Sequence, residues 1–152
     1  MQFSIPPKFE PIAILNKSDV SYDFAIKSKT KKLEIRYWVL SIRRSAEEPN
    51  NEANTIHRGV ISVLRSRISG LSVPGKQYSS YQAYSRANVN AEFGADAGGT
   101  LLTPCNSEFG TGYKKCWITV IHKDNVADAY IFILFDDPQV LQMTIEAADV
   151  YH

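Results

Sequence analysis

The feature that most constrains the fold is a pair of apolar stretches close together in the C-terminal half. KKCWITVIHK covers residues 114–123, ADAYIFILFD begins at residue 127, and the short segment DNVA (124–127) joins them. Alternate positions of the second stretch are apolar on both faces: Ala129, Ile131, Ile133 and Phe135 on one, Tyr130, Phe132 and Leu134 on the other. A strand covered on both faces is usually central in its sheet. The sequence therefore predicts a central antiparallel hairpin.

A second hairpin is predicted nearer the N-terminus. Residues 20–28 and 33–43 alternate and are rich in β-branched and aromatic side chains, and the polar segment KTKK (29–32) lies between them. GGTLLTP (98–104) is a further short strand, and PIAIL (11–15) is a possible first one. Residues 1–9 are expected to be loosely ordered, because prolines cannot join a central ladder.

Two segments have helical character. Residues 54–70 place Ile56, Val60, Val63, Leu64 and Ile68 at helical spacing, with Gly70 after the end. The C-terminal segment begins with Asp137 as N-cap and Pro138 at the first helical position. Residues 71–90 are too rich in Ser and Asn for a firm assignment and are compatible with a short strand or an irregular crossover.

These elements predict a single α+β domain over residues 1–152. The expected architecture is a mostly antiparallel sheet of about six strands packed by two main helices. The length of 152 residues suits one domain that buries a core without a disulfide or a metal.

The glycine-rich stretch AEFGADAGG (91–99) is predicted to shape the chain rather than to bind phosphate. Its glycines precede a strand and no Lys follows, whereas phosphate loops need glycines between a strand and a helix. Phe93 is expected to anchor the core, and Asp96 to bond backbone amides in the turn. A Glu92–Asp96 carboxylate pair is the catalytic alternative, but such pairs are usually solvated.

No constellation of metal-binding or catalytic residues is visible in the sequence. His57, His122 and His152 form no short metal motif, so any site would have to be assembled from distant residues. Cys105 and Cys116 could face each other across paired strands, but two reduced thiols are the favoured state. The sequence predicts no catalytic residue, no metal and no cofactor, and an enzyme with a scattered site remains the third hypothesis.

The charge is balanced overall, at +1, but is segregated along the chain. Lys123 is the only basic residue after position 116, against six acidic ones. The basic segment KSKTKK (27–32) is typical of a soluble turn, and no nucleic-acid contact is predicted. No segment has the length of a membrane span and no signal peptide is visible, so a cytoplasmic location is expected, or a periplasmic or secreted one if a leader was removed.

The order of elements, together with NAEFGADAGG (90–99) and YIFILFDD (130–137), resembles the PsbP-like fold group. That group includes the photosystem II extrinsic subunit and small Ran-binding proteins. The resemblance covers mainly residues 92–149. It implies a largely non-enzymatic protein that binds other proteins, and it brings no catalytic residues to this chain.

The favoured function is a non-catalytic protein-interaction module, such as a bacterial accessory or immunity-type protein. Its contact surface is expected at the acidic residues Asp124, Asp128, Asp136 and Asp137. The alternative is a small-molecule-binding protein with an aromatic pocket lined by Trp38, Tyr81, Tyr84, Phe93 and Trp117.

Overall fold

The computed structural model describes residues 4–15, 18–42, 56–70 and 81–142. It shows a single α+β domain built on a seven-stranded antiparallel sheet, one strand more than expected. The sheet order is β1-β2-β3-β7-β6-β5-β4. The strands are β1 (Phe9–Pro11), β2 (Phe24–Ser28), β3 (Leu33–Ser41), β4 (Gln82–Ala83), β5 (Ala97–Pro104), β6 (Lys115–Lys123) and β7 (Ala127–Phe135).

Both predicted hairpins are present, and β7 occupies the centre of the sheet. It pairs along its whole length with β3 on one side and with β6 on the other. The turn between β6 and β7 is tight, and Asn125 adopts a positive φ of 61° there. The first strand begins before PIAIL, because Phe9 pairs with Ser28 and is buried. Residue 9 is therefore packed, although residues 1–9 were expected to be loosely ordered.

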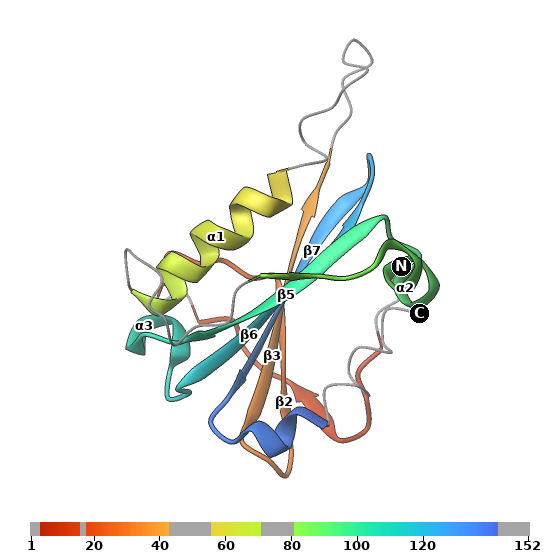
Figure 1. Cartoon of the computed structure of the whole chain (residues 1–152). Coiled ribbons are helices and arrows are strands. Elements are labelled where there is room, and N and C mark those ends of the chain that lie inside the picture. The colour runs from red at the N-terminus through yellow and green to blue at the C-terminus, as the bar shows by residue number, and fades with distance from the viewer. Residues whose placement is uncertain (1–3, 16–17, 43–55, 71–80, 143–152) are drawn as a thin grey trace.

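Helices cover both faces of the sheet (Figure 1). On one face, α1 (Ile56–Ser69) packs over β5 and β6 through His57, Ile61, Leu64 and Ile68. On the other face lie α2 (Arg86–Phe93), which packs on β5, and the 3₁₀ helix η2 (Pro138–Gln142), which packs on β7. The short α3 (Ser107–Gly110) joins β5 to β6. No helix within the described residues has the length and apolar character needed to cross a bilayer.

Two buried clusters, one per face, form the core. The α1 face is centred on Ile118, Val120, Tyr130 and Phe132, and the opposite face on Ile26, Ile35, Ile131 and Phe135. Because both faces of the sheet are covered, the polar residues Glu34 and Arg36 of β3 are buried as well, at 7% and 1% exposed. Arg36 bonds the Glu34 carboxylate and donates to the Phe109 carbonyl oxygen at 2.6 Å.

The AEFGADAGG stretch has the structural role that the sequence predicts. Gly94 ends α2 in the left-handed conformation at φ 62°, and Phe93 packs against the core of the face opposite α1. A Cβ on Gly98 would lie 2.6 Å from the Val120 carbonyl oxygen, and one on Gly99 would overlap the Tyr81 ring. Asp96 accepts a hydrogen bond from the Asp124 backbone N–H at 2.8 Å, as a turn-forming aspartate should.

Several expectations were incomplete, or fall where the structure gives no description. The segment after residue 80 contains β4, a short strand that the sequence allowed within residues 71–90, and α2, which was not predicted. The C-terminal helix starts at Pro138 as predicted but is 3₁₀ in form to Gln142. Its expected continuation, residues 71–80 and His152 lie outside the described residues.

Candidate functional site

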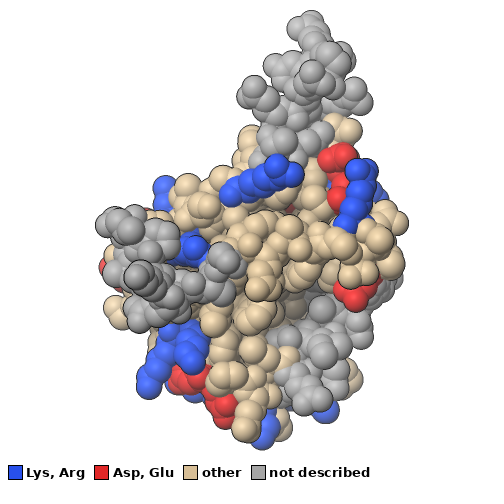
Figure 2. All heavy atoms as spheres, in the orientation of Figure 1, with Lys and Arg blue, Asp and Glu red and all other residues tan. Residues whose placement is uncertain are grey.

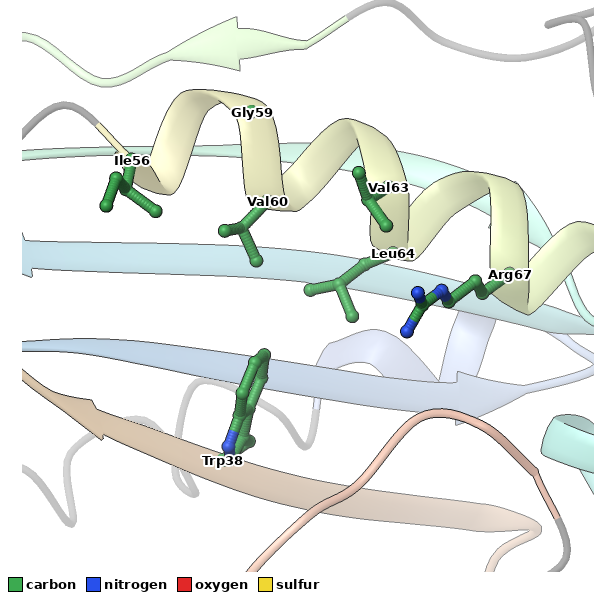
Figure 3. Close-up of a pocket in the computed structure, with 7 residues that line it drawn as sticks. All are labelled: Trp38, Ile56, Gly59, Val60, Val63, Leu64 and Arg67. Carbon is green, nitrogen blue, oxygen red and sulfur yellow. The ribbon is translucent and has the colours of Figure 1, made fainter. Parts of the chain in front are cut away.

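An apolar groove lies between α1 and the end of β3 (Figure 3). Its volume is about 490 Å³. The lining consists of apolar side chains, one glycine and a single charged residue: Trp38, Ile56, Gly59, Val60, Val63, Leu64 and Arg67. Trp38 projects from β3 toward α1, which supplies the other six residues.

The groove is open because α1 sits to one side of the sheet. The helix contacts β5 and β6, while β3 lies two strands further on, beyond β7. Gly59 adds to the opening, since a Cβ there would have no neighbour within 4 Å. Trp38 stacks on Tyr130 at 5.0 Å between ring centroids and so forms a rigid wall.

The apolar surface extends beyond the groove itself. Ile56 is 48% exposed, Val63 is 50% exposed, and Leu40, which follows Trp38 on the same face of β3, is 37% exposed. Exposed apolar side chains that form one contiguous patch are typical of binding sites, whereas isolated ones are not.

Basic side chains accompany this apolar surface. The helix α1 carries Arg58, Arg65 and Arg67 and no acidic residue. Figure 2 shows Lys and Arg side chains along the part of the surface that α1 occupies in Figure 1. The field at the groove therefore favours an anionic group on whatever binds there.

A second polar feature is buried at the end of the sheet where β6 turns into β7. His122 and Asp128 are cross-strand partners, and His122 Nδ1 lies 2.5 Å from Asp128 Oδ1. The other ring nitrogen, Nε2, lies 2.7 Å from Asp124 Oδ1 in the turn. His57, from the first turn of α1, stacks on His122 at 4.5 Å between centroids with an interplanar angle of 16°.

The electrostatics of this cluster follow from its burial. His57, His122 and Asp128 are all buried, at 3%, 1% and 1% exposed. Burial lowers the pKa of His57, and the neighbouring His122 lowers it further. Burial also raises the pKa of Tyr130, whose hydroxyl lies near Asp128. The three donor groups of His57, His122 and Asp128 lie within 4.8 Å of one another, which is close enough to hold a metal ion.

The four aspartates proposed as a contact surface do not form one patch. Asp124 and Asp128 lie at one end of β7, and Asp136 and Asp137 at the other, roughly 25 Å away at 3.3 Å per residue. Asp128 is buried against His122 and cannot reach a partner, while Asp136 is bonded by Lys32. Figure 2 likewise shows acidic groups in separate places on the face it displays.

The five aromatic residues proposed as one pocket are divided between the two faces of the sheet. Trp38 and Tyr81 pack on the α1 face, and Phe93 and Trp117 on the opposite face. Tyr84 is on that opposite face too, against Gly98 and Val89. Of the five, only Trp38 lines the groove.

The remaining candidates are placed as follows. Cys105 and Cys116 are free thiols, in line with the expectation. Burial raises the pKa of Cys116, and the neighbouring Cys105 raises it further. Glu92 is exposed on α2. The groove was not predicted from the sequence, although Ile56, Val60 and Val63 were recognised as part of one helical stripe. In the structure α1 turns His57, Ile61, Leu64 and Ile68 toward the sheet and leaves Ile56 and Val63 about half exposed.

Comparison with known proteins adds no identification. No protein-family model matches the chain, and no curated protein is similar to it in sequence. The PsbP-like resemblance therefore stays a prediction.

Proposed function

We propose that the chain is a non-catalytic protein-interaction module that binds a short peptide segment of a partner protein in the groove between α1 and β3. The segment presents two or three apolar side chains to the groove and an acidic side chain to Arg67. The observation that carries this proposal is the exposed apolar lining with a single cation at one end.

The apolar side chains of the groove are exposed enough to be covered by a partner. Val63 and Ile56 line the groove, and each is about half exposed. Burying apolar surface contributes about 25 cal/mol per Å², so a partner that covers these side chains and the Trp38 ring gains affinity directly. Trp38 also resembles a binding hot spot, since tryptophans that are held rigidly dominate interface energies.

The arginines of α1 favour a partner segment that carries negative charge. Since α1 carries three arginines and no acid, an acidic residue beside the apolar side chains would be attracted and a basic one repelled. This differs from the expectation from the sequence, in which the contact surface of the chain itself was acidic.

A peptide fits this groove better than a small molecule or a nucleic acid. Small-molecule sites combine an apolar lining with several converging polar groups, whereas Arg67 is the only charged group in this lining. Nucleic-acid sites place basic side chains over phosphates rather than beside an aliphatic floor.

The test uses a random-peptide phage library selected against the immobilised full chain. Selected peptides are synthesised and titrated into the Trp117→Phe variant, so that Trp38 alone reports binding by its fluorescence. Val63→Glu places a carboxylate in the groove, and Ser62→Glu places the same carboxylate one residue away, outside the lining.

We expect the selected peptides to combine apolar and acidic residues and to blue-shift the Trp38 emission. Val63→Glu should weaken their binding at least tenfold, which is about 1.4 kcal/mol, while Ser62→Glu should change it less than threefold. Failure to select any peptide, or equal binding by both variants, would refute the proposal.

A further inference from the structure

The buried cluster of His57, His122 and Asp128 has a geometry that the peptide-binding proposal does not use. Its members come from three elements, α1, β6 and β7, and converge on one point inside the domain. We propose that these three side chains bind a divalent transition-metal ion of the Zn²⁺ type.

Two buried polar atoms in the cluster lack hydrogen-bond partners among the described residues. They are His57 Nδ1 and Asp128 Oδ2. Buried polar atoms are nearly always satisfied, so these two call for an explanation. The residues that carry them have donor atoms within 4.8 Å of one another, and the Tyr130 hydroxyl near Asp128 is a third buried polar atom without a partner among the described residues. His57 Nδ1 and Asp128 Oδ2 are both metal-ligating atoms, a ring nitrogen and a carboxylate oxygen, and a cation between them would satisfy both at once.

The donor set indicates the class of metal. Two imidazoles and one carboxylate suit Zn²⁺ and its first-row neighbours, whereas Mg²⁺ and Ca²⁺ prefer oxygen ligands alone. Three protein ligands leave the fourth position of a tetrahedral ion for a water molecule. The charges also match, because a buried carboxylate beside two neutral imidazoles compensates part of the charge of the ion.

The outer contacts are those that a metal-bound histidine requires. With the ion on His122 Nδ1, the Nε2–H donates to Asp124 Oδ1, which already lies 2.7 Å away. The turn that holds Asp124 is fixed in its own right, because the Asp124 N–H donates to Asp96 Oδ2 and the Asp96 N–H donates to the His122 carbonyl oxygen. A carboxylate that orients the second nitrogen of a histidine is the usual outer contact in zinc sites.

Metal binding would change one contact in the cluster. His122 Nδ1 and Asp128 Oδ1 now share a hydrogen bond at 2.5 Å, and the ion would replace its proton and move the two groups apart to metal-ligand spacing. The ligands are each 3% exposed or less, so the ion would be shielded from bulk solvent. The ion would tie the first turn of α1 to the β6–β7 hairpin.

The experiment uses the untagged full chain with ZnCl₂ as the probe and MgCl₂ as the comparison. Metal content is measured after dialysis, affinity by calorimetry, and stability by thermal unfolding with and without Zn²⁺. The variants are His57→Gln, which removes a ligand, and Asp124→Asn, which alters only the outer contact. Asp137→Asn is the matched control on an exposed acid at the far end of β7, and Cys105→Ser tests whether a thiol binds the metal instead.

We expect one Zn²⁺ per chain and a rise in Tm of roughly 5–10 °C at 100 times the Kd, with no effect of Mg²⁺. His57→Gln should abolish the rise, and Asp124→Asn should weaken binding about 10- to 100-fold. Asp137→Asn and Cys105→Ser should behave as the wild type.

Absence of stoichiometric Zn²⁺ binding by the wild type would overturn the proposal, as would loss of binding in Cys105→Ser. If His57→Gln does not fold, Asp124→Asn decides the matter, since its side chain is 48% exposed and tolerates the change. Wild-type affinity in Asp124→Asn would then count against the site.

Discussion

Replacing Arg36 with methionine tests how the α1 face of the sheet tolerates a charge in its core. The guanidinium is 1% exposed and bonds the buried Glu34 carboxylate. It also donates to the Phe109 carbonyl oxygen at 2.6 Å and to Thr111 Oγ1 at 2.9 Å. The rings of Phe109 and Tyr22 lie 4.8 and 4.9 Å from its Cζ.

The expected cost follows from what the substitution leaves behind. Arg36→Met retains the aliphatic volume but leaves the Glu34 carboxylate buried without its cation, and breaking a buried pair in this way costs about 3–5 kcal/mol. Taking the middle of that range, we expect the free energy of unfolding to fall by about 4 kcal/mol. That is a large fraction of the 5–15 kcal/mol typical of a domain.

Urea unfolding followed by circular dichroism measures this change. With a slope of about 2 kcal/mol per molar urea, the midpoint should fall by about 2 M. The double variant Glu34→Leu/Arg36→Met removes both charges and should recover at least half of the loss, because an apolar pair of similar volume is often no worse than a buried ion pair. A loss below about 1 kcal/mol in the single variant, or a double variant that is no more stable than the single one, would refute this reasoning.

Three further substitutions test other contacts. Gly98→Ala brings a Cβ to within 2.6 Å of the Val120 carbonyl oxygen and should lower the free energy of unfolding in urea by about 1–3 kcal/mol. In Gly99→Ala only the Tyr81 ring has to move, so its loss should be smaller. A loss in Gly98→Ala that is equal to or smaller than the loss in Gly99→Ala would contradict the close approach. Leu64→Ala removes a side chain that is 5% exposed and should lower stability by about 2–5 kcal/mol, with a Tm unchanged from the wild type as the contrary result. The Lys32 hydrogen bond and the Lys114 N–H hold the pKa of Asp136 below its ordinary value, so its contribution to stability is present at neutral pH and is lost as the pH falls below about 4. Asp136→Asn should accordingly be less stable than the wild type at pH 7 and approach it at pH 3, and a constant difference across this range would be inconsistent with the ion pair.

Most strands of the sheet could be predicted from the sequence because each shows a clear pattern of apolar, β-branched and aromatic side chains. The β6–β7 hairpin is the clearest case, since both faces of β7 are apolar and the connecting turn is short. The helix α2 was missed because it buries only Val89, so it has no apolar stripe, although Ser85 and Gly94 cap it in the usual way. Helix-capping residues without periodicity are weak evidence in a segment rich in Ser and Asn.

The candidate sites were harder to predict because they depend on how elements pack. Once the β6–β7 turn is fixed, counting outward along the hairpin pairs His122 with Asp128, so that contact was within reach of the sequence. The approach of His57 was not, because it depends on where α1 crosses the sheet. The groove has the same origin: Trp38 and Val63 line one cavity only because α1 lies over β5 and β6.

Two adjacent glycines in β5 have a consequence for finding relatives of this chain. Gly99 is covered by the ring of Tyr81 on one face and Gly98 by Tyr84 on the other, so the aromatic rings that flank β4 occupy space that β5 leaves empty. A larger residue at either glycine displaces its tyrosine or a neighbouring strand, and a smaller residue at either tyrosine opens a hole beside its glycine. These four positions should therefore vary as a unit, and a Tyr-x-x-Tyr pair followed after thirteen residues by Gly-Gly is the spacing to look for in homologues whose overall similarity has faded.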